Sequence, residues 1–353
     1  MVELAARRTD SGTAGAAGGG GAEPALTVDR LTRRFGDQVA VDALSFDVHA
    51  GELFGIVGPD GAGKTTTLRI LAGVLPPTSG DARILGVSVA RDPERVKPHI
   101  AYMPQRFGLY EDLTVQENLD FYADLHRVPR AERRARLERL YGFSRLGEFR
   151  DRLAGALSGG MKQKLALSCA LIHHPRVLLL DEPTFGVDPI SRRDLWLILH
   201  ERVADGVTVV VTTSYLDEAE RCDRVALLDH GRLLALDSPA ALQAGLEGRL
   251  LAVCAPDPRR ARRALLDSGV VRTAALFGDR VHVVLEHDGE PDAVRRALDD
   301  AGIVAAIEPI PPSLEDVFID RTGGNRGPRR TGAEHAVHAG HADRAGRPHR
   351  SDP

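Results

Sequence analysis

The sequence predicts an α/β fold, with a largely parallel sheet covered by helices and a small α+β unit after it. The apolar, β-branched run LFGIVG at 53–58 predicts a buried strand, and TTTLRILAG at 65–73 predicts the helix that follows it. Farther along, a strand at 177–181, a helix around 191–204 and a strand at 207–213 continue the alternation. Alternation of this kind is typical of parallel sheets with helices on both faces.

The elements before and between these strands have other patterns. Residues 25–35 and 39–52 alternate apolar and polar side chains, which favours an antiparallel sheet with one packed face. Residues 106–157 carry apolar residues at helical spacing, and Thr114 with Glu117 predicts a capping box. We therefore expect a main domain over 25–245 with a helical subdomain at about 106–157.

The segment 246–320 predicts a separate small α+β domain. GRLLAVCA, DRVHVVLEH and IVAAIEPI have strand patterns, and PRRARRALLDSG and EPDAVRRALDDAG have amphipathic helical patterns that end at glycine. Residues 1–24 and 321–353 lack large apolar side chains, and we expect both to be disordered. The second of these tails holds four histidines, for which we favour a solvated tail over a metal site: His335, His338, His341 and His349.

Composition limits the class of protein. The 353 residues are 43% hydrophobic and 27% charged with a net charge of −4, which argues against general affinity for nucleic acid. No apolar run approaches the ~18 residues of a membrane span. Arg7 and Arg8 precede no apolar stretch, so we expect no secretory signal. Three scattered cysteines favour buried thiols in a reducing compartment.

The segment GPDGAGKTT at 58–66 has the spacing of a phosphate-binding loop between a strand and a helix. Glycines allow backbone N–H groups to approach phosphate oxygens, Lys64 supplies a cation, and Thr65 offers a hydroxyl to Mg²⁺. The free N–H groups at the helix start favour anions as well. The predicted fold is thus that of a P-loop NTPase, and the residues expected to hold the phosphates here are Gly58, Pro59, Asp60, Gly61, Ala62, Gly63, Lys64, Thr65 and Thr66.

An acidic pair follows the strand VLLL. Asp181 at the carboxyl end of that strand is the expected holder of Mg²⁺, and Glu182 the expected general base for the attacking water. A purely structural role for this pair, as a helix cap and a surface charge, is disfavoured because the same chain carries a phosphate-binding loop.

With LSGGMKQKL at 157–165 the sequence resembles the ATP-binding subunits of ABC transporters, over roughly residues 26–240. The resemblance implies a head-to-tail dimer in which Ser158, Gly159 and Gly160 contact the γ-phosphate of ATP held by the other subunit. The structural reading of Ser158 is a cap for the helix that begins there.

The resemblance implies roles for three further residues. Phe35 matches the aromatic residue that stacks on adenine, although a strand phenylalanine is ordinarily core. Gln105 matches the glutamine that senses Mg²⁺ and water and links the site to the membrane subunit. Asp188 matches the loop that crosses the dimer interface.

Two positions depart from the family pattern. Met161 stands where glutamine is frequent, and we expect little effect. Ser214 stands where the family has a switch histidine, and serine is shorter and carries no charge. One reading is hydrolysis that relies on Glu182 and Gln105, which we favour. The other is a degenerate site that needs a competent partner subunit.

Several phrases resemble multidrug-export ATPases that pair with type-2 ABC permeases: LYEDLTVQENLDFYA, FGVDPISRR, YLDEAERCDRV and PPSLEDVFI. The resemblance implies a homodimer or heterodimer, peripheral on the inner face of the cell membrane through a separate permease and exporting a drug, lipid or metabolite. Alternatives are a non-hydrolysing ATP-gated regulator and an ABC ATPase that acts on ribosomes or DNA.

Overall fold

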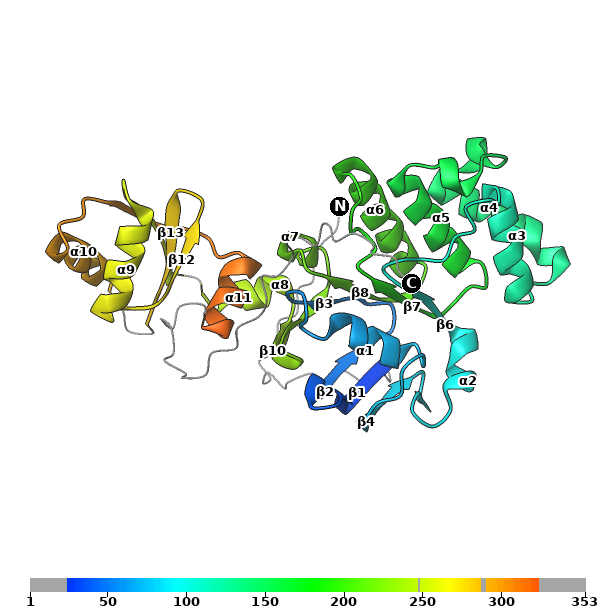
Figure 1. The fold of residues 1–353 in the computed structure, drawn as a ribbon, viewed down its shortest axis with the longest axis horizontal. Coiled ribbons are helices and arrows are strands. Elements are labelled where there is room, and N and C mark those ends of the chain that lie inside the picture. Colours follow the sequence, from blue (N-terminus) through cyan, green and yellow to red (C-terminus); the bar gives the residue numbers. More distant parts are fainter. Residues whose placement is uncertain (1–23, 247, 287–289, 324–353) are drawn as a thin grey trace, which may run out of the picture.

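The computed structural model describes residues 24–246, 248–286 and 290–323. The larger part holds two sheets and most of the helices, and a smaller part lies at one end of the molecule (Figure 1). The expectations for the N-terminal tail and for the histidines at 335, 338, 341 and 349 concern residues outside these ranges.

The larger part is built around a six-stranded sheet in the order β10-β9-β3-β8-β7-β6. Its five strands β9, β3, β8, β7 and β6 are parallel, and β10 is antiparallel to β9. The predicted parallel sheet is therefore confirmed. The strand bounds are β3 Leu53–Val57, β6 Ile100–Met103, β7 Val177–Asp181, β8 Thr208–Thr213, β9 Arg224–Asp229 and β10 Arg232–Asp237.

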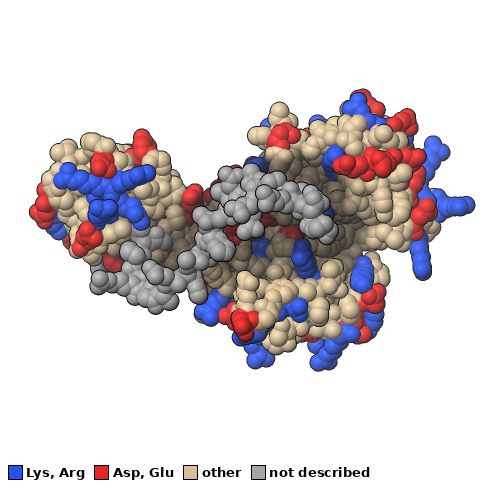
Figure 2. Space-filling view, in the orientation of Figure 1, with Lys and Arg blue, Asp and Glu red and all other residues tan. Residues whose placement is uncertain are grey.

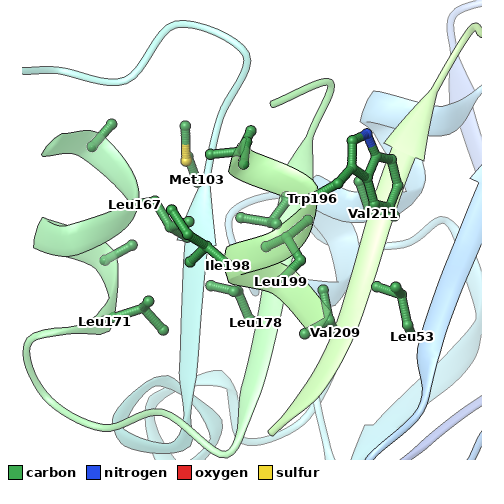
Figure 3. Packing of buried hydrophobic residues seen from close by; sticks show 14 of the residues in the cluster. Leu53, Met103, Leu167, Leu171, Leu178, Trp196, Ile198, Leu199, Val209 and Val211 are labelled. Atoms are coloured by element: carbon green, nitrogen blue, oxygen red, sulfur yellow. The ribbon is translucent and has the colours of Figure 1, made fainter. Parts of the chain in front are cut away.

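Successive side chains of the central strands pack to opposite faces of this sheet. On β7, Leu178 and Leu180 join one buried cluster while Val177 and Leu179 join another. Helices α5 (Gly159–Leu171) and α6 (Pro189–Ala204) cover the first face, where Leu167 and Trp196 pack over β6, β7 and β8 (Figure 3). Helix α1 (Lys64–Leu71) contributes to the second cluster. Burial on both faces explains why these strands are apolar throughout.

A four-stranded antiparallel sheet, in the order β2-β1-β4-β5, packs against α1. Strands β1 (Leu26–Phe35) and β2 (Gln38–Val48) are the two strands predicted at the N-terminus. The hairpin turn at Gly36 connects them. This sheet also contains β4 (Ser79–Ile84) and β5 (Val87–Ser88), which the sequence pattern did not predict.

The helical segment packs against α5, on the side of the molecule where β6 forms the edge of the sheet (Figure 1). Helix α3 begins with the predicted capping box, in which Glu117 N–H donates to Thr114 Oγ1 at 3.1 Å and Thr114 N–H donates to Glu117 Oε2 at 2.8 Å. The elements of this segment are α3 Val115–Leu125, α4 Arg130–Ser144, η2 Gly147–Phe149 and η3 Ala154–Ala156. The short elements α2 (Pro93–Val96) and η1 (Lys97–His99) come before β6, and Val96 of α2 belongs to the second buried cluster.

The small C-terminal part has the element order βαββαβ and one antiparallel sheet, β12-β13-β11-β14. Its two amphipathic helices, α9 and α10, bury their apolar stripes against one face of that sheet. The bounds are β11 Leu250–Cys254, α9 Pro258–Ser268, β12 Val271–Phe277, β13 Arg280–Leu285, α10 Pro291–Asp300 and β14 Ala306–Pro309. The predicted α+β class is confirmed, with β12 as an additional strand.

Helix α11 (Leu314–Thr322) joins the two parts. It packs against α7 (Leu216–Ala219) and α8 (Pro239–Ala244) of the larger part, and against β12 of the smaller part. Its Leu314 and Val317 belong to the same buried cluster as Ala219. The segment PPSLEDVFI is therefore a bridge to the larger part as well as the end of the small domain.

Among the residues that the structure describes, no helix is long and apolar enough to cross a membrane.

We expect Cys254 to be the only thiol that reacts quickly in the folded protein. Cys169 and Cys222 are buried, and burial raises the pKa of both thiols well above the ordinary value, so the reactive thiolate is scarce. Titration with a chromogenic disulfide reagent should give one fast equivalent before denaturation and three after it, since the chain has three cysteines. Cys254→Ser should remove the fast equivalent, and two or more fast equivalents in the folded protein would contradict the expectation.

A stacked histidine pair should make the fold sensitive to acid. The rings of His126 and His173 lie 4.0 Å apart, and burial lowers the pKa of both, that of His173 to about 4. The unfolded chain takes up a proton on His173 near pH 6.5 and the folded chain does not, so stability is lost as the pH falls from about 6.5 to about 4.

The variant His173→Gln retains a donor for the Ile100 carbonyl, which His173 Nε2 contacts at 2.9 Å, but does not titrate. Urea unfolding at pH 7 and pH 4.5 should show a smaller loss of unfolding free energy in this variant, by at most about 3 kcal/mol. An equal loss in both proteins would show that the pair does not carry the effect.

Candidate functional site

The predicted phosphate loop lies between the end of β3 and the start of α1. Backbone atoms of neighbouring segments lie very close to two of its glycines, Gly58 and Gly63. A Cβ on Gly58 would lie 2.2 Å from the Leu228 carbonyl oxygen. Gly63 has φ of +96°, and a Cβ there would lie 2.4 Å from the Ala40 carbonyl oxygen. The glycines are therefore required by close backbone approach as well as by the turn.

The loop forms the floor of an open cavity of about 340 Å³. Gln38 and Ala40 line it although the sequence did not single them out; the only signal was their place just after the Gly36 turn. The residues that line it are Phe35, Gln38, Ala40, Asp60, Gly61, Ala62, Gly63, Lys64, Thr65, Thr66, Gln105 and Glu182.

The ammonium group of Lys64 is buried at the end of this cavity. Lys64 Nζ donates to the carbonyl oxygens of Gly58 at 2.8 Å and Pro59 at 3.0 Å. It also donates to Ser214 Oγ at 2.8 Å and lies 3.2 Å from Glu182 Oε1. A buried cation is tolerated because these groups satisfy it.

Glu182 is held from two sides. Its Oε1 accepts a hydrogen bond from Ser214 Oγ at 2.9 Å, and its Oε2 accepts one from Gln105 Nε2 at 3.0 Å. Its backbone has φ of +47°, an unusual left-handed conformation for a residue other than glycine, and its N–H donates to Thr212 Oγ1 at 2.9 Å. The structure thus brings Lys64, Glu182, Gln105 and Ser214 together.

Asp181 and Thr65 place two hard oxygen donors side by side. Asp181 Oδ1 accepts from Thr65 Oγ1 and from Thr212 Oγ1, each at 2.9 Å. Burial raises the pKa of Asp181, and the two hydroxyl groups oppose that shift. A hydroxyl beside a buried carboxylate fits Mg²⁺, which prefers oxygen ligands. Sequence reasoning missed Thr212, because only the register of the sheet shows that it lies opposite Asp181 on the neighbouring strand β7.

Phe35 is exposed rather than part of the core, with 47% of its surface accessible. It lies at the rim of the cavity, and the guanidinium of Arg33 stands 4.6 Å from its ring centre. An exposed aromatic ring at the mouth of a phosphate cavity is available for stacking.

The signature segment lies elsewhere on the chain. Ser158 caps α5 by accepting a hydrogen bond from the N–H of Met161 at 3.3 Å, and Ser158, Gly159 and Gly160 do not line the cavity. A Cβ on Gly160 would lie 2.1 Å from Ser191 Oγ, so the starts of α5 and α6 are in close contact.

Asp188 caps α6. Its Oδ1 accepts from the N–H groups of Ile190 at 3.1 Å and Ser191 at 2.9 Å. Asp188 also does not line the cavity. One chain therefore brings neither Asp188 nor the signature residues to the phosphate loop.

Another cavity, of about 280 Å³, begins at Gln105 and runs along α5 past Phe107, Leu109 and Lys162. A row of aromatic rings extends from this cavity over α3. The ring centres of Phe107 and Tyr122 are 5.3 Å apart, and those of Tyr110 and Phe121 are 4.6 Å apart. Tyr110 is 47% exposed and Phe121 37% exposed. The same glutamine thus lines both the phosphate cavity and an aromatic surface.

Comparisons with known proteins identify relatives with the same motifs. The family described as ABC transporter matches residues 41–185. The chain is 45% identical to the probable multidrug ABC transporter ATP-binding protein YbhF of Escherichia coli (strain K12), over 85% of this chain and 52% of the relative, so it spans about half of YbhF. It is 36% identical to the Nod factor export ATP-binding protein I of Ralstonia nicotianae, over 86% of this chain and 95% of the relative.

Solved structures share the fold. An ATP-binding subunit of an ABC transporter is 32% identical with a TM-score of 0.57, covering 62% of this chain and 92% of that one. A dimeric ATP-binding cassette in a post-hydrolysis state with ADP and Pi is 26% identical with a TM-score of 0.56, covering 60% of this chain and 98% of that one. With a relative matched along nearly its whole length, the predicted P-loop fold is confirmed, and the chain belongs to the ABC transporter family as one of its ATP-binding proteins.

Proposed function

We propose that this chain binds ATP with Mg²⁺ and hydrolyses it in a head-to-tail dimer that drives a separate membrane permease. One observation carries the proposal: Lys64, Gln105 and Ser214 all contact the carboxylate of Glu182, which lines the phosphate cavity. This arrangement combines a cation for phosphate with a held carboxylate that can accept a proton from water.

Glu182 acts as the general base. The contacts of Gln105 and Ser214 with its two oxygens orient the carboxylate, while Lys64 lies 3.2 Å from Oε1. When phosphate oxygens enter the cavity, Lys64 turns its charge toward them and frees Glu182 to accept a proton. Thr65 and Asp181 would hold Mg²⁺, which neutralises charge on the transferred phosphoryl group.

Ser214 takes the place of the switch histidine by a different contact pattern. Its hydroxyl reaches Lys64 Nζ, Glu182 Oε1 and, at 3.4 Å, Asp60 Oδ1. It is neutral at all physiological pH values, so it orients these groups without adding charge. A non-hydrolysing ATP-gated regulator is the second candidate, favoured by the same substitution.

The site requires a second subunit. Ser158 and Gly159 are exposed at the start of α5 and do not line the cavity of their own chain. Their free N–H groups suit the γ-phosphate of ATP bound by the partner. The dimeric cassette with ADP and Pi among the structural neighbours supports this arrangement. We propose that Asp188 lies at that interface and that Phe35 stacks on adenine.

The aromatic surface beside Gln105 is the proposed docking site for a helix of a type-2 permease. The names of the relatives, multidrug and Nod factor export, support an exporter of drugs, lipids or metabolites. Docking there would place the chain on the inner face of the cell membrane.

Residues 25–245 would form the ATP-binding domain and 246–320 the accessory domain. On the face drawn in Figure 2, acidic and basic side chains are mixed over the larger part, whereas a nucleic-acid-binding surface is predominantly basic.

Replacing Glu182 by Gln should lower ATP turnover by at least about 100-fold, because the amide cannot accept the proton. Binding of a fluorescent ATP analogue should change by less than about threefold. Purified wild-type protein and Glu148→Gln, an exposed glutamate on the helical segment, serve as controls. Unchanged turnover in Glu182→Gln would remove the assignment of the base, and no turnover in wild-type protein that binds ATP would favour the regulator.

Substitutions of Ser214 test its orienting role. Ser214→Ala removes the hydroxyl contacts with Lys64 and Glu182, and kcat should fall by about tenfold. Ser214→His should introduce a titration of kcat near pH 6.5 that wild-type protein lacks at this position. Steady-state rates from pH 5.5 to 8.5 provide the measurement. Identical profiles in all three proteins would show that position 214 does not contribute to turnover.

A further inference from the structure

A buried carboxylate lies behind the catalytic residues. Glu218 on helix α7 is 1% exposed and does not line the phosphate cavity. Burial of a carboxylate costs several kcal/mol unless polar partners satisfy it. The identity of those partners therefore indicates what the charge does.

Two threonine hydroxyls donate to the same oxygen of Glu218. Thr184 Oγ1 and Thr213 Oγ1 each lie 2.8 Å from Glu218 Oε2, and both threonines are buried. The other oxygen, Oε1, lies 3.3 Å from Arg192 Nε in an ion pair that lacks hydrogen-bond geometry. One carboxylate thus holds three side chains from three different segments.

Each threonine belongs to a segment of the site. Thr184 lies two residues after Glu182, and Thr213 immediately precedes Ser214. The N–H of Tyr215 donates to Thr213 Oγ1 at 3.0 Å, so Thr213 also fixes the chain on the far side of Ser214. Glu182 has the left-handed φ of +47°, which surrounding contacts must maintain. Glu218 therefore joins the backbone that carries Glu182 to the backbone that carries Ser214.

Arg192 extends the connection to α6. Its guanidinium pairs with Glu218 and stands 4.8 Å from the ring centre of Tyr215. Its neighbour Ser191 contacts Gly160 at the start of α5 and bonds to the α6 cap Asp188. The segments proposed to face the partner subunit are thus attached to the same carboxylate.

We propose that Glu218 is a positioning residue for ATP hydrolysis, and this inference rests on the proposed function. It holds the segments 182–184 and 213–215 at a constant separation through Thr184 and Thr213. Ser214 and Glu182 are then placed for their 2.9 Å contact, and Lys64 is placed against both. Glu218 does not line the phosphate cavity, and its hydrogen-bond partners Thr184 and Thr213 do not line it either.

The competing reading is a buried ion pair that stabilises the fold and nothing more. Removing one partner of such a pair destabilises a protein strongly. That reading predicts a lower melting temperature with kcat intact in the molecules that remain folded. A positioning role predicts a lower kcat in fully folded protein.

The test compares Glu218→Gln with Asp217→Asn, a matched change at an exposed acid on the same helix. At a temperature where both are folded, kcat of Glu218→Gln should fall by about 10- to 100-fold with KM changed by less than about threefold, because small displacements of reacting groups have effects of this size. Asp217→Asn should match wild type. An unchanged kcat in folded Glu218→Gln would overturn the proposal.

Single-arm variants cover the case in which Glu218→Gln does not fold. Thr184→Val and Thr213→Val each remove one hydroxyl with little change of volume. Each should lower kcat, and the double variant should lower it by less than the product of the two effects, because both arms act through one carboxylate. Full additivity would contradict a shared anchor.

Hydrogen exchange separates this inference from the proposed function. In nucleotide-free protein, Glu218→Gln should speed amide exchange in peptides covering 182–188 and 212–219 together, whereas Asp217→Asn should not. Exchange that changes only within 216–219 would overturn the coupling. If wild-type protein binds ATP without turnover, hydrolysis fails as the proposed function, and the paired change in exchange still decides whether Glu218 joins the two segments.

Discussion

The burial of the Lys64 ammonium group is the constraint on which the rest of the site depends. A cation in this position requires partners on every side, and it finds them in two loop carbonyls, the Glu182 carboxylate and the Ser214 hydroxyl. The carbonyls are available only because glycine allows the loop to turn back beneath the lysine. The carboxylate is available only because Glu182 adopts a left-handed backbone conformation. The positions of these groups around the phosphate cavity thus follow from the requirement to satisfy the buried Lys64 ammonium group.

Parallel strand order brings these groups to one edge of the sheet. Strands β3, β8 and β7 are neighbours, and their carboxyl ends are followed by Gly58, Ser214 and Glu182. The strands are held in register by apolar side chains on both faces, which α5 and α6 cover on one side. Strand ends in such a sheet are rigid while the loops after them are free to carry polar groups. The Glu218 network behind the site adds polar connections between two of those loops.

The loop GPDGAGKTT and the segment LSGGMKQKL occupy different places in the fold. The phosphate loop and the signature segment lie apart on the same chain, and the start of α5 is packed tightly against the start of α6 by Gly160. Helix α11 ties the small domain to α7, the helix that carries Glu218. Helix α11 therefore packs against the same short helix whose Glu218 accepts hydrogen bonds from Thr184 and Thr213.

Local sequence determined the phosphate loop, the strand before it, the helix caps at Thr114 and Ser158, and the amphipathic helices of the small domain. These features depend on residue type and spacing over a few positions, which a sequence displays directly. Tertiary structure alone decided that Ser214 contacts Lys64, that Thr212 supports Asp181, that Phe35 is exposed and that Glu218 anchors two loops. It also decided where β4, β6, β9, β10 and β12 pair. These outcomes depend on contacts between segments many residues apart, and strand order and register create those contacts without any local pattern to mark them.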